Sequence, residues 1–103
     1  MDKKYFKKLL EALFDEKKIQ ILKLCLNKRF SIIEIKEKLN LSYTLTWRKI
    51  HELEEVKLIK RSNREDVKGR IIDIKTDVNE MNKIKKQFVI YIDEVCKTIK
   101  ETN

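Results

Sequence analysis

Apolar residues recur at intervals of three and four along most of this chain. This spacing places side chains on one face of an α-helix, so it indicates amphipathic helices with one buried side. The pattern predicts helices over residues 2–14, 15–28, 31–40, 42–56 and 78–101. The chain also has no Pro and a single Gly, the two residues that interrupt helices, which agrees with a mainly helical fold.

Most of the predicted helices begin after a residue whose side chain can cap them. A cap accepts a hydrogen bond from the backbone N–H groups that the first helical turn leaves without a partner. Ser31 is followed three residues later by Glu34, the spacing of a reciprocal capping box. The other candidate caps are Asp2, Asp15, Ser42 and Asp77, the last again with an acidic residue, Glu80, three positions on.

Only Asn40, which suits a helix end, and Leu41 stand between the body of the helix over 31–40 and the cap of the next one, Ser42. Two helices joined by so short a turn form a helix-turn-helix. After it, residues 58–62 and 70–75 are typical of β-strands, with Ile72 and Ile74 expected to face inward, and a charged, turn-rich loop joins them. The sequence therefore predicts a mainly α fold with a small β-hairpin, or wing, beside the helix-turn-helix.

The helix over 42–56 has two distinct faces. At about 100° per residue, Thr46, Ile50 and Leu53 share a stripe that faces the core. A second face carries two aromatic rings among polar and basic groups, so the rings either pack under the wing and the first helix or meet a partner. The pattern leaves both interpretations open for this face, which consists of Tyr43, Thr44, Trp47, Arg48 and His51.

The formal net charge is +8 on 103 residues, with acidic residues interspersed among the basic ones. A folded basic domain favours a polyanionic partner, with nucleic acid ahead of an anionic membrane surface, although such charge also serves solubility alone. No run of 18 apolar residues is present, which excludes a transmembrane helix. The basic, amphipathic N-terminus lacks the continuous apolar stretch of a secretory signal.

The residue types in the second face and in the wing suit contacts with DNA. Arg can bind guanine through two hydrogen bonds, and hydroxyl groups can bind phosphates or base edges. The first N–H groups of a helix can hold a phosphate, and wing cations can reach the backbone or the minor groove, although a charge run is also usual on a solvated surface. The predicted DNA contacts are Ser42, Tyr43, Thr44, Trp47, Arg48, Lys49 and His51 in the helix, and Lys60, Arg61, Arg64, Lys68 and Arg70 in the wing.

The last predicted helix carries an apolar seam close to a heptad repeat. A terminal helix of this length needs something to cover that seam, and the first helix can cover only part of it. A second copy of the chain would cover the rest in a symmetric homodimer, although a monomer with an internally buried helix is the alternative. The expected dimer interface is Phe6, Leu9, Leu10 and Leu13 with Met81, Ile84, Phe88, Ile92, Val95 and Ile99.

Nothing in the sequence indicates an enzyme, a cofactor or a metal site. A Gly-rich phosphate loop, a Ser/His/Asp or His/Cys constellation and a metal-spaced cluster are all missing. Cys25 and Cys96 lie far apart in helical patterns, so we expect two small buried residues in a reducing cytoplasm and no disulfide framework.

Between residues 15 and 75, a characteristic order of residues adds to this interpretation. The short helix matches S-x-x-E-L with Ile35 at the last position, and the next matches L-S-x-x-T-V-x-R-H-L-x-x-L-x-x-x-G-L-I in part. The matching residues are Ser31, Glu34, Ile35, Leu39, Leu41, Ser42, Arg48, Ile50, Leu53, Leu58 and Ile59. In this order they resemble the winged helix-turn-helix core of ArsR- and MarR-like transcription regulators.

Three departures from that pattern limit what the resemblance implies. Thr46 stands at a usual Val, and Lys57 stands where Gly usually ends the helix. Ile32 and Ile33 lie in the helix where the metal-sensing branch carries Cys-x-Cys, so metal sensing is not implied.

The leading hypothesis is a single domain over 1–103 that regulates transcription as a homodimer. Its winged core would span 15–75, and the helices over 2–14 and 77–101 would form the dimerisation element. Helix 42–56 would enter the major groove, with the basic wing, 60–70, on the backbone or in the minor groove. The alternatives are an architectural DNA-binding protein with little sequence preference and a winged helix that binds another protein. No small-molecule effector is identified.

Overall fold

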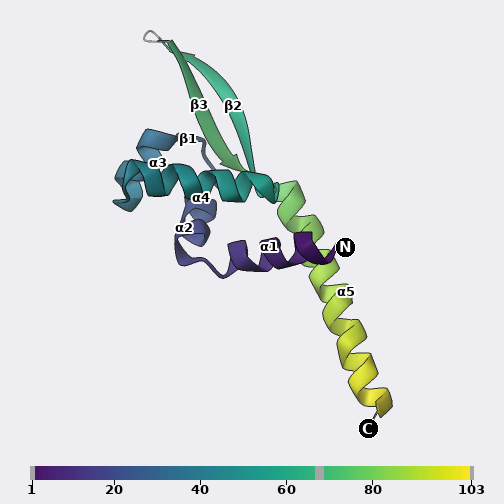
Figure 1. Cartoon of the computed structure of the whole chain (residues 1–103). Helices are drawn as coiled ribbons and strands as arrows, with labels where there is room; N and C mark the ends of the chain where they lie inside the picture. The colour runs from purple at the N-terminus through teal and green to yellow at the C-terminus, as the bar shows by residue number, and fades with distance from the viewer. Residues whose placement is uncertain (1, 67–68, 103) are drawn as a thin grey trace.

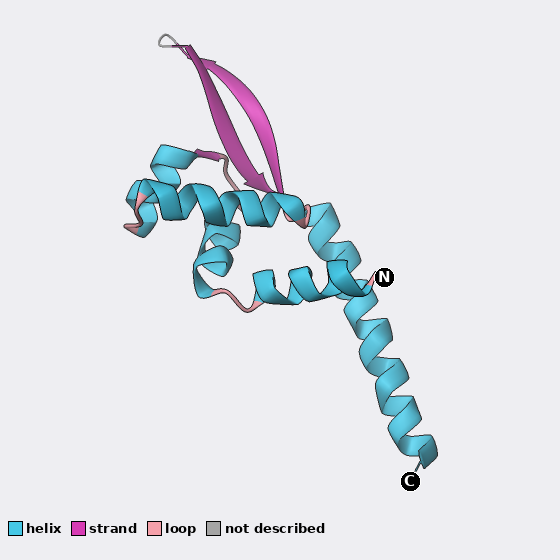
Figure 2. Cartoon of the chain, in the orientation of Figure 1, coloured by secondary structure: helices cyan, strands magenta, loops and turns pink. Residues whose placement is uncertain are grey.

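Five α-helices and three β-strands make up the part of the chain that the computed structural model describes, residues 2–66 and 69–102 (Figures 1 and 2). The predicted helix-turn-helix and wing are both present, as is the long terminal helix. In chain order the elements are α1 (Lys3–Leu13), α2 (Glu16–Leu24), β1 (Phe30–Ser31), α3 (Ile32–Leu39), α4 (Tyr43–Glu55), β2 (Ile59–Asp66), β3 (Gly69–Thr76) and α5 (Val78–Thr102).

The helices begin at the residues that the sequence marked as caps. The Ser31 Oγ accepts a hydrogen bond from the Glu34 N–H at 3.2 Å, and the Glu34 carboxylate accepts one from the Ser31 N–H at 3.1 Å, which completes the capping box. The other predicted caps also accept a backbone N–H: Asp2 from Lys4, Asp15 from Lys18, Ser42 from Leu45 and Asp77 from Glu80.

The two helices of the helix-turn-helix end at residues in the left-handed backbone region. Asn40, at φ 53°, makes the turn between α3 and α4, and this residue type tolerates that conformation. Lys57, at φ 62°, ends α4, and the Leu58 N–H then donates to the Leu53 carbonyl at 3.1 Å. The chain therefore turns sharply into the wing with Lys at a position that favours Gly.

The three strands form one antiparallel sheet in the order β1-β3-β2. The second helix ends at Leu24, short of the predicted residue 28, and β1 was not predicted, because a two-residue strand is too short to show an alternating pattern. β1 pairs through Phe30 opposite Ile74, and the end of β3 is tied to the end of α2 by the Thr76 N–H, which donates to the Cys25 carbonyl at 3.0 Å.

The wing strands are also longer than predicted, since β2 includes residues 63–66, which were expected to form a loop. Asn63 and Arg64 of this outer part of β2 are exposed, so no apolar alternation marks it as a strand in the sequence. Ile74 is fully buried as expected, but Ile72 is 37% exposed because it lies farther out along the wing.

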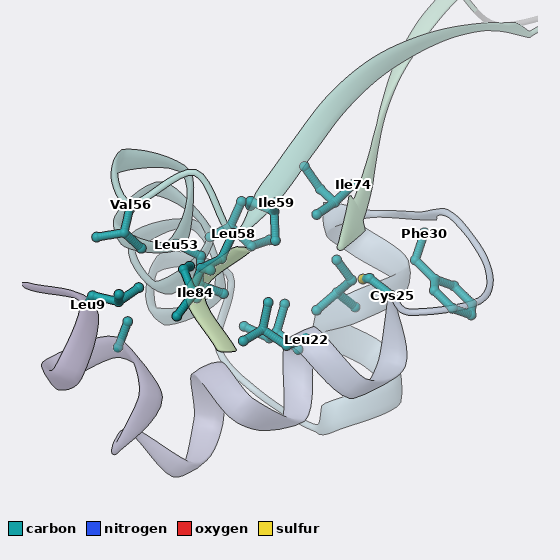
Figure 3. Close-up of a cluster of buried hydrophobic side chains, with 14 residues drawn as sticks. Leu9, Leu22, Cys25, Phe30, Leu53, Val56, Leu58, Ile59, Ile74 and Ile84 are labelled. Carbon is teal, nitrogen blue, oxygen red and sulfur yellow. The ribbon is translucent and has the colours of Figure 1, made fainter. Parts of the chain in front are cut away.

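The core lies between α1, α2, α4 and the base of the sheet (Figure 3). Thr46 is fully buried with Ile50 and Leu53 on the inner side of α4, and its hydroxyl donates to the Ser42 carbonyl at 2.8 Å. The Thr46 hydroxyl, at a position where the related pattern has Val, therefore has its hydrogen-bond partner within the helix. The buried apolar residues are Leu9, Ala12, Ile21, Leu22, Cys25, Phe30, Ile35, Ile50, Leu53, Val56, Leu58, Ile59, Ile74 and Ile84.

Only the first half of α5 packs against this body, and the second half projects away from it (Figure 1). The Phe6 ring of α1 contacts Phe88 and Tyr91 at centroid distances of 5.4 and 5.5 Å, which holds the two helices together. Cys96, farther along α5, is exposed, so the expectation of two buried cysteines is correct only for Cys25. No helix within residues 2–66 and 69–102 is long and apolar enough to cross a membrane.

Candidate nucleic-acid interface

The second face of α4 points to solvent, which excludes the interpretation that its rings pack under the wing and the first helix. Tyr43 and Trp47 are 51% and 43% exposed, so neither ring is core. The Trp47 indole stacks on the His51 imidazole with centroids 5.1 Å apart and planes 17° apart. We call Tyr43, Thr44, Trp47, Arg48 and His51 the recognition face.

The residues of the recognition face border an open groove along α4. The groove has a volume of about 390 Å³, and Glu52 joins the five residues in lining it. The aromatic rings give it an apolar floor, whereas the hydroxyl groups, the imidazole and the guanidinium supply hydrogen-bonding groups at its edges. The Ser42 cap places the N-terminus of α4 at one end of this surface.

Glu52 links the recognition face to the body, a role that sequence analysis missed. Its carboxylate lies 2.5 Å from the Nζ of Lys18, whose side chain is only 7% exposed, and 3.8 Å from the Nε of Arg48. The buried amine fixes the carboxylate, and the carboxylate in turn stands beside the guanidinium. Only the four-residue spacing of Arg48 and Glu52 signals this arrangement in the sequence.

Lys49 lies away from the recognition face, contrary to its inclusion among the DNA contacts. Its Nζ pairs with the Asp15 carboxylate at 2.5 Å, and its side chain is 16% exposed, so it joins α4 to α2. Partial burial raises the pKa of Asp15, but hydrogen bonds from Lys49 and from the Lys18 N–H outweigh it and leave the pKa lowered. We therefore remove Lys49 from the candidate interface.

The predicted wing cations are largely engaged by carboxylates of the same chain. Lys60 lies 3.6 Å from Asp77, and Arg61 pairs with Glu54 of α4. Arg64 lies 3.4 Å from Glu34 and 3.3 Å from the buried Asp73, whose Oδ1 makes no hydrogen bond with suitable geometry. Lys68 lies outside the described residues, as does the side chain of Arg70. The strongest candidate surface is therefore the recognition face, with the wing as a flanking element.

The residues expected at a dimer interface fall into three groups. Leu9 and Ile84 are buried in the core of the chain itself. A partly buried group comprises Leu13, Met81 and Phe88, which pack against that core, and Phe6 and Leu10. Ile92, Val95 and Ile99 are 40–55% exposed on the projecting half of α5.

By sequence, the chain matches no protein-family model and no curated protein. Its structure is similar to several solved ones. An ArsR-like transcriptional regulator from Rhodococcus sp. RHA1 superposes with a TM-score of 0.76 at 18% identity, over 96% of this chain and 93% of that one. NolR from Sinorhizobium fredii gives 0.62 at 19% identity, over 85% of each chain.

A third similar structure is the homodimeric winged helix-turn-helix DNA-binding domain of a possible ArsR-family transcriptional regulator from Mycobacterium bovis. It gives a TM-score of 0.66 at 15% identity, over 88% of this chain and 81% of that one. At such identities the similarity concerns the fold. The chain has the winged helix-turn-helix fold.

Proposed function

We propose that this protein is a DNA-binding transcription regulator that acts as a homodimer. The observation that carries the proposal is the recognition face, where exposed Tyr43 and Trp47 stand beside Arg48 on the second helix of a helix-turn-helix. In this fold the second helix enters the major groove, and its outward side chains meet the base edges.

Each group of the recognition face has a role in this proposal. The Arg48 guanidinium reads a guanine, and the hydroxyls of Tyr43 and Thr44 bind base edges or phosphates. The Trp47 ring lies against a sugar or a thymine methyl group. Ser42 and the N-terminus of α4 hold a phosphate, because a helix N-terminus favours negative charge. The wing cation Arg61, on the side of the sheet that α4 covers, flanks the site on the DNA backbone once its ion pair with Glu54 opens.

The homodimer is supported by the exposed apolar side of α5. Ile92, Val95 and Ile99 form a row of aliphatic side chains that is exposed to water. Burial of this row against a second copy of the chain would be favourable. Beside them, a groove of about 430 Å³ runs between α1 and α5, bordered by residues that include Phe6 and Tyr91. A two-fold axis at this surface would present two recognition faces to half-sites about one helical turn apart.

Selection from random DNA duplexes tests the proposal most directly. The wild-type protein should enrich a motif with two related half-sites, and Arg48→Ala should lose preference at one base in each, weakening binding by about 1–3 kcal/mol. Lys97→Ala, on the exposed C-terminal half of α5, is the matched control and should enrich the wild-type motif.

The outcomes separate the alternatives. If the affinity for the selected motif does not exceed the affinity for non-specific DNA at physiological salt, the protein is an architectural DNA-binding protein and not a sequence-specific regulator. Absence of any salt-dependent DNA binding would point to a protein partner and refute the proposal. An unchanged motif in Arg48→Ala would refute the role of that side chain alone.

A further inference from the structure

A second concave site lies where the base of the wing meets α5. A pocket of about 300 Å³ opens there, and basic side chains from the segment before β1, from β2 and from β3 border it together with the first residues of α5. The function proposed above makes no use of this pocket.

Three of the cations that border the pocket stand in one line across the sheet. Lys60 of β2 is directly opposite Lys75 of β3, and Phe30 of β1 is opposite Ile74. Arg29 precedes Phe30, so it continues this register on the other side of Lys75, and it borders the same pocket. We call Arg29, Lys75 and Lys60 the cation row.

Such a row is unfavourable without a counter-charge. Directly opposite side chains in antiparallel strands share one face with Cβ atoms about 5 Å apart, and like charges in that position destabilise the pair. The Asp77 carboxylate lies 3.6 Å from Lys60, but it also accepts the Glu80 N–H at 3.0 Å. Within the described residues no carboxylate pairs with Arg29 or Lys75. The cation row therefore keeps an excess of positive charge around a concave space.

The cation row and the recognition face belong to different sides of the sheet. Successive side chains of a strand point to opposite faces, so Arg61 points away from the face that carries Lys60. Arg61 reaches Glu54 of α4, which places α4 on the side opposite the cation row. A DNA duplex bound to the recognition face therefore would not supply the negative charge that the cation row lacks.

The scaffold around the pocket is fixed by backbone hydrogen bonds. The Thr76 N–H donates to the Cys25 carbonyl at 3.0 Å, and the Asp77 N–H donates to the Leu58 carbonyl at 2.9 Å. These bonds hold the junction of β3 and α5 against the body. The N–H groups of Val78 and Asn79 stand at the start of α5, where the helix dipole adds to the positive potential.

We propose that this pocket binds a small anion that carries phosphate or carboxylate groups, through charge-assisted hydrogen bonds from Arg29, Lys75 and Lys60. The volume suits a ligand larger than a single ion, and the cation row suits one with two or more anionic groups. The proposal does not depend on the function given above, because binding to the pocket requires no DNA.

Calorimetric titration of the full chain with pyrophosphate and with citrate, at constant ionic strength and without DNA, tests it. One of the two should bind, and the preferred probe tells phosphate from carboxylate chemistry. Lys75→Gln and Arg29→Gln should each weaken that binding about tenfold, since each removes one charge-assisted bond. Both variants relieve like-charge repulsion and should stay folded by circular dichroism. The control Lys97→Gln should bind as the wild type does.

Three results would overturn the proposal. The first is that neither probe binds the wild-type protein. The second is an equal affinity in all the variants, which would mean a diffuse attraction to a basic surface. The third is a Lys75→Gln protein that loses DNA affinity in anion-free buffer while its binding of the probe is unchanged, which would make the cation row a contact for the DNA backbone.

Discussion

α4 and α5 both present apolar groups to solvent, but the two exposed surfaces differ in chemistry. On α4 the exposed rings of Tyr43 and Trp47 carry their own hydrogen-bonding groups and stand beside Arg48. On the projecting half of α5 the exposed residues, such as Ile92 and Val95, are aliphatic. The first surface suits a hydrated, charged partner, and the second suits a dry protein contact.

The difference arises from how each helix meets the core. α4 lies across the body and buries Thr46, Ile50 and Leu53 along its inner side, so its other face is free for a partner without loss of stability. α5 buries Ile84 near its start and then leaves the body (Figure 1). One helix therefore has its own core contact along its length, whereas the described residues of the projecting half of the other pack against no part of the core.

Ile92→Glu should give the largest effect. An unpaired carboxylate in an apolar interface is costly, so the dimer should dissociate, and DNA affinity should fall about 100-fold or more as two linked half-site contacts become one. Light scattering after size exclusion and a DNA titration measure the two changes. Lys97→Glu on the same helix is the control and should remain dimeric. A wild-type protein that is monomeric at micromolar concentration would contradict the assignment of α5.

Leu53→Ala and Trp47→Ala should separate the two sides of α4. Removing the fully buried Leu53 side chain should lower the free energy of unfolding by about 3 kcal/mol. Removing the exposed Trp47 ring should change it by less than about 1 kcal/mol but weaken DNA binding about tenfold. Urea denaturation and fluorescence anisotropy report the two quantities. If Trp47→Ala destabilises the fold as much as Leu53→Ala does, the recognition face is structural.

Lys57→Gly should have a smaller and favourable effect. Lys57 ends α4 at φ 62°, where a Cβ atom is strained, so Gly should raise the free energy of unfolding by about 0.5 kcal/mol after its own entropic cost. Asn40→Gly, at φ 53°, is the matched control and should be close to neutral because Asn tolerates this region. Neither change should alter dimerisation or DNA binding, since both faces lie elsewhere. A lower free energy of unfolding for Lys57→Gly would contradict the prediction, because it would show that contacts of the Lys57 side chain stabilise the fold.

The smallest effect concerns Glu34, in the helix that supports α4. The hydrogen bond from the Ser31 N–H, aided by Arg64, holds the pKa of Glu34 below its usual value of 4.5. The stability that this carboxylate contributes is present above that value and is lost as the pH falls through the lowered pKa. Between about pH 5 and pH 3, the free energy of unfolding of the Glu34→Gln variant should therefore fall less than that of the wild type, as measured by urea denaturation. Parallel curves for the two proteins would contradict the prediction. The aliphatic side chains of α5 do not titrate, so this dependence belongs to the body alone.

Local signals in the sequence located most of the helices. Ser31 with Glu34, and Asp15, Ser42 and Asp77, marked helix starts that the structure confirms, because capping depends on residues within one turn. The core stripe of α4 followed from spacing alone. β1 was missed because it is two residues long and pairs with a strand distant in the chain, and the outer part of β2 was missed because its residues are polar and show no apolar alternation.

The sequence by itself determined where the helices begin, which side of α4 is apolar and that the chain is basic, since these depend on residue type and local spacing. The tertiary structure alone decided that Trp47 faces solvent and that Lys49 forms an ion pair with Asp15. It also placed Arg29 in line with Lys75 and Lys60. Each of these outcomes depends on residues distant in the chain, because the partner of a long charged side chain is set by which segments the fold brings within a few ångströms of it.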